Sequence, residues 1–380
     1  MNKMDKLNGL IKIGLLKYLQ RHDIVSMSKC CHIMCKTIKP YTVSLCRYNQ
    51  QNYLLLPEEL RKNVSKFIID YAQTNFIPLT VKDLLMKGTL PSELQKGMIP
   101  EGITKLNLGN FYNWHIKKDV LPSSLKIIIF SFYFNKKISN IFHEGLTHIS
   151  FGWSFNKPIK KGVLPKSITY LYFNNNFNQN INGIFHEGLI SLILGDSFNQ
   201  PLEKLGLPNT LKLLILGSNY NHSLDDILPP ELQKLILGQS YNYSLEKLPK
   251  KLEVLTLGTC FNHPIKVLPD SLVEVNTGFY FNIPLSDMHF PKNLQILRLS
   301  YKFNHPIKKG DLPNLHTLEF SGIFNHSLDG ILPKTLKELV LNGTFNHPLN
   351  DIPSLEKLTL SHKYKHSLDK LQCLIIRYFY

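Results

Sequence analysis

The chain has 380 residues, of which 43% are hydrophobic, enough for two or three domains or for one domain and a repeat array. This composition excludes an intrinsically disordered chain. No run approaches the roughly 18 consecutive apolar residues of a membrane span, and charged residues interrupt the N-terminal stretch where a signal peptide would be apolar. We therefore expect a soluble, cytoplasmic protein with no membrane partner.

The formal net charge of +16 allows two interpretations. A basic surface favours nucleic acid, but nucleic-acid interfaces use clustered arginine, whereas this charge is mostly lysine spread along the whole chain. The alternative is an AT-rich genome, which produces chains rich in Lys, Asn, Ile and Tyr. We expect nucleic acid not to be the partner. The arginines are Arg21, Arg47, Arg61, Arg298 and Arg377.

Residues 5–48 predict a small module of three short helices. Apolar residues at helical spacing mark the first helix, Asp23 is a suitable N-cap for the second, and Pro40 ends the third. The order of leucines, acidic residue and further apolar residues resembles an F-box, the module that docks a Skp-type linker of a cullin-RING ubiquitin ligase. The resemblance implies that a Skp-type adaptor and its cullin ligase are partners, bound through Leu15, Leu16, Leu19, Asp23, Ile24 and Met27.

The match to the F-box is degenerate at its start, because Asn8-Gly9-Leu10-Ile11 replaces the Leu-Pro-x-Glu of the family. A trio of amphipathic helices with another role gives a similar pattern. The same segment holds a cysteine cluster that zinc ligation or buried helical thiols would explain. Because no second Cys-x-x-Cys or His-x-x-x-His pair accompanies it, we expect reduced, buried thiols and no metal or other cofactor. The clustered cysteines are Cys30, Cys31, Cys35 and Cys46.

Residues 49–98 are interpreted as a connector. Pro57 at a helix start, two glutamates after it and apolar residues on one face predict a helix over Leu56–Asn75. Together with the less regular residues up to 98, this helix would cap the open end of the repeat array that begins at residue 99.

From residue 99 to 380 a pair of an aromatic residue and asparagine recurs every 20 to 22 residues. Self-similarity at this period predicts a solenoid of about 13 coils, in which each coil buries its apolar face against its neighbours. The asparagines form a structural column. They are Asn113, Asn135, Asn156, Asn178, Asn199, Asn221, Asn242, Asn262, Asn282, Asn304, Asn325 and Asn346.

Each coil begins with Leu-x-x-Leu-x-Leu, as in Leu232, Leu235 and Leu237, which ends four residues before the aromatic residue. The alternation predicts a short strand, and such strands would stack in parallel. A glycine such as Gly238 gives the next turn backbone freedom, the aromatic ring packs inward, and the asparagine amide bonds backbone groups of its own and the adjacent coil. About eight residues remain for the return limb, too few for an ordinary helix.

The motif Phe-Asn-x-Pro-Ile/Leu followed by Leu-Pro-x-x-Leu, as at Phe261–Ile265 and Leu268–Leu272, resembles the FNIP repeat. This repeat is known mainly from social amoebae and from giant viruses that infect amoebae, so a viral origin would place the protein in the host cytoplasm. Two coils depart from the motif and carry IFHEGL. The resemblance implies a mainly β fold, a leucine-rich-repeat-like parallel β-solenoid preceded by the small α-helical F-box-like module, a pairing that recurs in this family.

Histidine follows the asparagine motif or its relic Tyr364-Lys365 in six coils. The simplest interpretation is a turn residue that repeats with the turn, and a metal site is the alternative, although no carboxylate column accompanies it. These histidines are His222, His263, His305, His326, His347 and His366.

The outward positions of the strands form the surface that we expect to act. In the early and middle coils they are apolar, which indicates either a protein-binding face or simply good strand formers. The predicted client-binding residues are Ile127, Ile129, Tyr170, Tyr172, Ile190, Ile193, Leu213, Ile215 and Ile236.

No catalytic constellation is present in the sequence, so we expect a protein that is not an enzyme. The first hypothesis is an adaptor whose helical module docks a ubiquitin ligase while its sheet holds an unknown protein client. The alternative is an interaction scaffold with a degenerate F-box and no ligase role.

Overall fold

The computed structural model describes residues 47–56, 58–70, 76–203, 206–350, 352–369, 371 and 373–378. The chain divides into two compact units, Met1–Lys157 and Pro158–Tyr380. Most of the expected F-box-like module lies outside the described residues. So do its cysteine cluster and all six positions predicted to contact a Skp-type partner.

In the described part of the first unit, consecutive strands pair in parallel, each with the next one along the chain. Two short helices lie between the first and second strands. The helices are α5 (Gln50–Leu54) and α6 (Glu58–Arg61). The strands are β1 (Arg47–Tyr48), β2 (Lys66–Asp70), β3 (Asp83–Lys87), β4 (Lys105–Asn107), β5 (Ile127–Ile129) and β6 (His148–Ser150).

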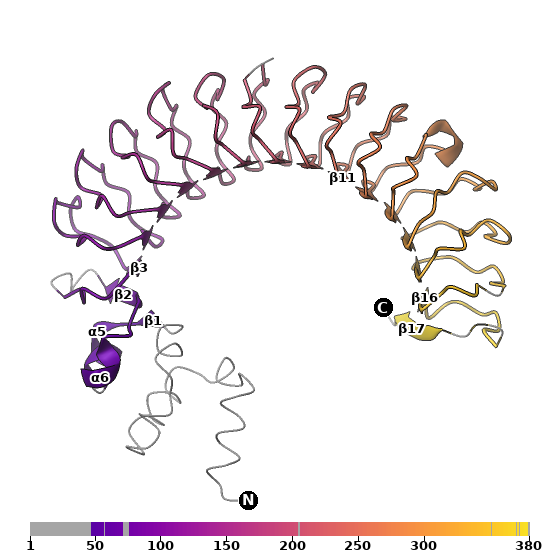
Figure 1. The fold of residues 1–380 in the computed structure, drawn as a ribbon, viewed down its shortest axis with the longest axis horizontal. Helices are drawn as coiled ribbons and strands as arrows, with labels where there is room; N and C mark the ends of the chain where they lie inside the picture. Colours follow the sequence, from indigo (N-terminus) through magenta and orange to yellow (C-terminus); the bar gives the residue numbers. More distant parts are fainter. Residues whose placement is uncertain are drawn as a thin grey trace, which may run out of the picture. The chain divides into compact units, whose positions relative to one another are not determined.

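The second unit repeats this plan, and every strand again pairs in parallel with its successor. In both units the strands line one side of the coils and the return limbs the other (Figure 1). The strands are β7 (Tyr170–Tyr172), β8 (Ser191–Ile193), β9 (Leu213–Ile215), β10 (Lys234–Ile236), β11 (Val254–Thr256), β12 (Glu274–Asn276), β13 (Ile296–Leu299), β14 (Thr317–Phe320), β15 (Glu338–Leu341), β16 (Lys357–Ser361) and β17 (Leu374–Tyr378).

Leucines and aromatic rings fill the interior of each coil. Leu235 at the centre of β10 is fully buried, as is Tyr241 in the turn that follows. The motif rings of successive coils lie almost parallel, with centroids 6.3 Å apart for Tyr241 and Phe261 and 6.2 Å apart for Phe324 and Phe345. The inward-facing aromatic column predicted from the sequence is therefore confirmed.

The return limbs are irregular, as the short spacing predicts. In the described residues of the repeats, the one helical segment on a return limb is a single turn of 3-10 helix, η3 (Leu285–Asp287). The predicted fold class, a mainly β, leucine-rich-repeat-like parallel solenoid, is confirmed.

The helix predicted over Leu56–Asn75 is wrong. Among the described residues of this range, Glu58–Arg61 is helical, and Lys66–Asp70 forms β2, which pairs with β1 and β3. The run Phe67-Ile68-Ile69 consists of strong strand formers, and its side chains are buried at 0 to 9% exposure. Burial between two strands outweighs the helical spacing, so the stack of strands continues into the segment that we interpreted as a connector.

The asparagine column is a hydrogen-bond ladder within each unit. In ten of the motif asparagines the backbone N–H donates to Oδ1 of the asparagine one coil earlier, at 2.9 to 3.2 Å. In the relic coil the N–H of Lys365 still donates to Asn346, at 3.0 Å. The predicted bond to the adjacent coil is confirmed, but the amides lie at the surface rather than inward, since Asn221 and Asn242 are exposed.

Glycine after the strand serves close packing more than backbone freedom. Gly195, Gly217, Gly238 and Gly258 do not have a positive φ. An added Cβ at Gly217 or Gly238 would lie 1.7 or 1.8 Å from the carbonyl oxygen of the glycine one coil earlier. Only glycine lets the backbones of adjacent coils approach this closely.

Candidate functional site

The outward side chains of β7 to β10 form an apolar row on the sheet of the second unit. The backbone register places one outward residue of each strand directly opposite an outward residue of the next strand. Each is half-buried, with its neighbours in the strand pointing inward. We call this set the apolar row: Tyr172, Ile193, Ile215 and Ile236.

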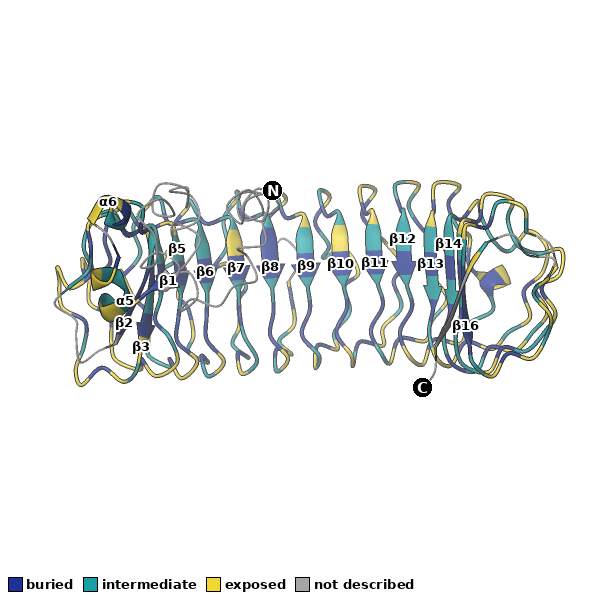
Figure 2. Cartoon of the chain, turned by 90° about the horizontal axis from the view of Figure 1, so that it is seen from below, coloured by how far each residue is buried: buried dark blue, intermediate teal, exposed yellow. Residues whose placement is uncertain are grey.

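A second outward row, at the start of the same strands, is mixed in character. It holds Tyr170, which is 44% exposed, and Leu213, but also a serine and a lysine. Ser191 takes the place that we expected for Ile190, which lies one residue before β8. Figure 2 shows the exposed starts of β7 and β10. The predicted client-binding set is thus one residue out of register at Ile190.

In the first unit, Ile127 and Ile129 are the outward residues of β5. Both are half-buried while Ile128 between them is fully buried, as the alternation predicts. The strands beside β5 carry polar outward residues, with Asn107 on β4 opposite Ile129 and His148 on β6 opposite Ile127. The apolar surface here is confined to one strand.

A shallow hollow of about 280 Å³ lies where the strands end, beside Tyr172, Ile193 and Ile215 of the apolar row. The glycine column forms its floor, because Gly195, Gly217 and Gly238 have no side chain to fill it. Asp196 borders the hollow, and its carboxylate accepts hydrogen bonds from Asn175 Nδ2 and Ser218 Oγ, each at 2.6 Å. The hollow thus has apolar side chains along one side, glycine backbone at its base and the carboxylate of Asp196 at its edge. This arrangement suits an extended peptide with a basic side chain.

Tyr172 stands at one end of the apolar row. Burial raises the pKa of its hydroxyl above the ordinary value of 10.0, and the negative charge of Asp196 raises it further. The phenol therefore stays neutral at physiological pH, so this end of the row carries no charge that would oppose an apolar partner.

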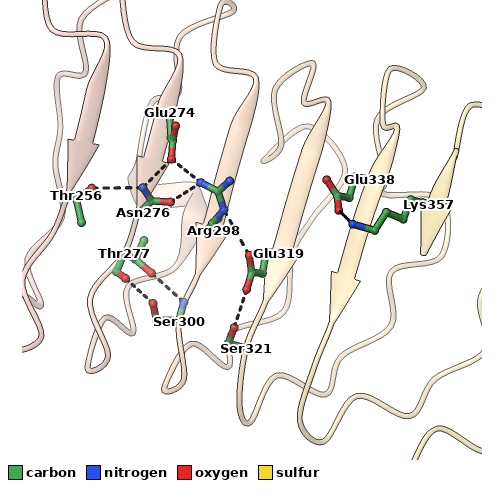
Figure 3. A network of polar contacts seen from close by, with 10 residues as sticks. All are labelled: Thr256, Glu274, Asn276, Thr277, Arg298, Ser300, Glu319, Ser321, Glu338 and Lys357. Carbon is green, nitrogen blue, oxygen red and sulfur yellow. Dashed lines mark hydrogen bonds and ion pairs between the residues drawn. The ribbon is translucent and has the colours of Figure 1, made fainter. Parts of the chain in front are cut away.

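The sheet face changes character at β12, where a polar network replaces the apolar row (Figure 3). Arg298 lies between two carboxylates, with Nη1 2.5 Å from Glu274 Oε1 and Nε 3.4 Å from Glu319 Oε2. Nη1 also donates to Asn276 Oδ1 at 2.9 Å, and Asn276 Nδ2 donates to Glu274 at 2.9 Å. Lys357 pairs with Glu338 at 2.5 Å. These charges satisfy one another, so this half of the face offers few free charges to a partner.

Burial alone would raise the pKa of Glu274. Hydrogen bonds from Asn276 and Arg298, with the positive charges of Arg298 and Lys234, outweigh burial, and the pKa falls below the ordinary value of 4.5. The carboxylate is therefore ionised at any physiological pH and keeps the network together.

The histidine column is structural. The Nε2 atom of each of the six histidines lies 2.9 to 3.1 Å from the backbone carbonyl oxygen of the asparagine one coil earlier, as in His263 with Asn242. Its ring also packs against the buried aromatic residue of its own motif. Each histidine thus donates a second inter-coil bond beside the asparagine ladder.

Sequence reasoning missed the exposed aromatic residues in the turns after β4, β5 and β6. Four of them contact one another and are 39 to 49% exposed. The signal was present, since the next five coils carry polar residues at the position of Phe132 and Trp153, namely Asn175, Asp196, Ser218, Gln239 and Thr259. We call this cluster the aromatic patch: Phe111, Phe132, Tyr133 and Trp153.

The described residues contain no group of three or more His, Cys, Asp or Glu side chains placed to hold a metal ion. Nor does any helix in the described part of the chain have the length and apolar character needed to cross a membrane.

Parallel strands stacked once per coil, with irregular return limbs and inward leucines, define a solenoid of the leucine-rich-repeat type, an architecture of protein-interaction scaffolds. The chain belongs to the FNIP repeat family. The model of the FNIP repeat matches residues 91–133, 134–176, 177–219, 220–260, 261–302 and 324–363.

A solved structure shows the same architecture. The chain is similar to CroV588, described as a novel circular LRR protein structure, with 30% identity and a TM-score of 0.76. The match covers 84% of this chain and 50% of CroV588, so the chain spans about half the length of that protein. YopM from Yersinia enterocolitica WA-314 matches at 18% identity and a TM-score of 0.47, over 84% of this chain and 70% of YopM. No curated protein matches the chain in sequence.

Proposed function

We propose that this protein is a non-catalytic adaptor whose sheet face binds a protein client. The observation that carries the proposal is the apolar row on β7 to β10, where four large side chains stand in register on an accessible surface. The polar network on β12 to β16 shows that this fold accommodates charged and polar residues at most outward positions. Strand propensity alone therefore does not account for the row.

The client would contact the apolar row and place a basic group against Asp196 at the edge of the hollow. Burying apolar side chains supplies affinity, and a charge at one end sets the orientation of the bound segment. Nothing in this arrangement performs chemistry, so any catalysis would belong to the partners.

The proposed biological role is recruitment of the client to a Skp-cullin-F-box type ubiquitin ligase. It is supported by the resemblance of the segment around Leu15, Leu16 and Leu19 to an F-box and by the recurrent pairing of that module with FNIP repeats. The alternative role is an interaction scaffold with a degenerate F-box that recruits no ligase.

The client-binding proposal is tested by affinity purification of the full chain with quantitative mass spectrometry. The variant carries Ile193→Asp and Ile215→Asp, and the control carries Val267→Asp at a return-limb residue that is 68% exposed. We expect client proteins to fall at least about tenfold with the double variant and to stay with the control. Equal recovery with all three proteins would overturn the proposal, provided that circular dichroism shows the same fold.

The ligase role is tested separately with purified Skp-type adaptor and full-length chain. Binding that Leu16→Asp with Leu19→Asp abolishes would support it, because both positions lie where an F-box contacts its adaptor. Absence of binding by the wild-type chain would favour the scaffold and would leave the client-binding proposal untouched.

A further inference from the structure

The aromatic patch of the first unit is a surface that the fold does not require. Phe111, Phe132, Tyr133 and Trp153 are 49%, 40%, 49% and 39% exposed. The equivalent turns between residues 175 and 260 of the second unit hold small or polar residues and make the same backbone hydrogen bonds from coil to coil. Further along, Phe279, Tyr280 and Tyr301 form a second, smaller cluster of exposed rings. Exposed aromatic residues that contact one another on a soluble protein mark an interaction site.

The arrangement of the rings limits what can bind. Phe111 and Tyr133 stack at 5.7 Å between centroids, with 21° between their planes, and Phe132 and Trp153 stack at 5.5 Å and 14°. Phe132 meets Tyr133 edge to face at 4.9 Å. The rings thus cover much of each other's flat faces, so a partner meets mainly ring edges and the grooves between the rings.

Nucleobases bind by stacking on a flat aromatic face, which this arrangement offers poorly. A polyproline II segment suits it better, because proline rings dock into grooves between aromatic side chains. Its pitch of three residues at about 3.1 Å is about 9.3 Å. Rings one coil apart in the patch lie 5.7 and 5.5 Å apart between centroids, so a segment of this pitch advances by a little less than two coils for every three residues. Phe111 and Trp153 lie two coils apart, so prolines three residues apart would reach rings toward both ends of the patch.

The coils that carry the patch have an excess of positive charge, which favours an acidic partner. Residues 105–157 contain seven lysines and no arginine, against Asp119 and Glu144. Two of these lysines pair with carboxylates of the preceding coil, Lys105 with Asp83 and Lys117 with Glu93. The second, smaller cluster of exposed rings, around Tyr301, lacks this excess, since residues 274–302 hold three Lys or Arg and two acidic residues.

From these observations we propose that the aromatic patch binds an extended proline-rich protein segment that carries acidic residues. The contact lies on the turns after β4 to β6 and is distinct from the apolar row. A partner could therefore engage it together with a client on the sheet or without one.

The two tryptophans of the chain make the proposal measurable. Trp153 belongs to the patch, and Trp114 donates from Nε1 to the Leu90 carbonyl at 2.9 Å. In the Trp114→Phe variant, Trp153 is the only tryptophan, so its emission reports the patch directly. If this variant does not fold, calorimetry on the wild-type chain replaces the fluorescence.

The probe is a synthetic dodecapeptide of Pro-Pro-x triplets with three glutamates. We expect a saturable blue shift of Trp153 emission and a loss of affinity of about tenfold or more for Phe132→Ser or Tyr133→Ser. Val267→Ser and Ile193→Asp with Ile215→Asp should leave the affinity unchanged, so the patch and the apolar row are tested independently.

Three controls define the outcomes that would overturn the proposal. One is an equal response to a peptide with alanine in place of proline. Another is a response only to oligo(dT)12, which would assign the patch to nucleic acid. The third is concentration-dependent dimerisation of the protein alone that Trp153→Ser abolishes, which would assign the patch to a second copy of the chain. Absence of any response would also reject it.

Discussion

The glycine column gives the sharpest test of how the coils pack, and Gly238→Ala is its clearest perturbation. A Cβ at this position would lie 1.8 Å from the carbonyl oxygen of Gly217 and 2.7 Å from its carbonyl carbon. Ordinary contact begins near 3.4 Å, so the oxygen would have to move by about 1.6 Å. That oxygen belongs to the backbone of the preceding coil, whose inward side chains are fully packed.

The cost depends on the group that must move. Overpacking of a rigid interior costs about 1–3 kcal/mol of unfolding free energy. Because the group in the way is backbone, which cannot rotate aside as a side chain can, we expect a loss of about 3 kcal/mol. Gln239→Ala, at the exposed neighbouring position, should change it by less than about 0.5 kcal/mol. Gly330→Ala is a second control, because no atom lies within 4 Å of its added Cβ and only the left-handed backbone, at φ +67°, is strained.

Urea denaturation followed by circular dichroism measures the loss, and hydrogen exchange locates it. In a solenoid each coil contacts mainly its neighbours, so protection should fall in the coils of β9 and β10 and remain near β16. A change of less than about 0.5 kcal/mol for Gly238→Ala would refute the close-packing argument. So would a loss of protection spread evenly over the second unit.

Three further predictions concern the columns and the polar network. Asn242→Ala should cost about 1 kcal/mol, because the N–H of Asn262 loses its acceptor, whereas Asn242→Asp keeps an oxygen there and should recover most of the loss in a thermal melt. Tyr241→Phe should leave the melting temperature unchanged or raise it, since the buried hydroxyl approaches the Leu224 backbone without a hydrogen bond of ordinary geometry and other coils carry Phe at this position; a drop equivalent to more than about 1 kcal/mol would contradict this. Glu274→Gln should cost about 1 kcal/mol at neutral pH. Because the folded pKa of Glu274 lies below its ordinary value of 4.5, its contribution is complete above that value and is lost as the pH falls through the folded pKa, so wild type and variant should converge in acid; a gap that stays constant from pH 7 to pH 2 would argue against it.

Periodicity is what made most of the fold predictable. A residue that recurs once per coil has the same environment in every coil, so twelve copies of one motif report a single geometry many times. Three features follow from this repetition: the end of strand β10 at Leu235 and Ile236, the inward ring of Tyr241 and the hydrogen-bond ladder through Asn242.

Sequence reasoning failed where the pattern is not repeated or depends on distance between coils. The stretch Lys66–Asp70 carries no repeat motif that could be aligned. Its apolar residues follow a helical spacing, although the segment forms strand β2, which is buried between β1 and β3. Gly238 was correctly assigned to the turn after the strand, but it is needed for close packing and not for backbone freedom. The approach of the backbone of an adjacent coil cannot be seen in the sequence. At Ile190 the predicted register was one residue off, because Ile190 precedes β8 and Ser191 takes the outward position.

The candidate site was predictable in part. Alternation placed Tyr172, Ile193, Ile215 and Ile236 on one face, but the hollow beside them depends on side chains that glycine lacks, which appears only when the coils are stacked. The aromatic patch could have been recognised from the aligned repeats at Phe132 and Trp153, since both stand where most coils carry polar turn residues.

The most direct test of the account is photo-cross-linking from the sheet face inside cells. A photoreactive phenylalanine analogue replaces Tyr172 at one end of the apolar row, and in a matched chain it replaces Val267 on a return limb. The account predicts a covalent adduct with a discrete client protein from position 172 and none from position 267. The absence of an adduct at position 172, or the same adducts from both positions, would contradict the claim that this sheet face is where the protein binds its client.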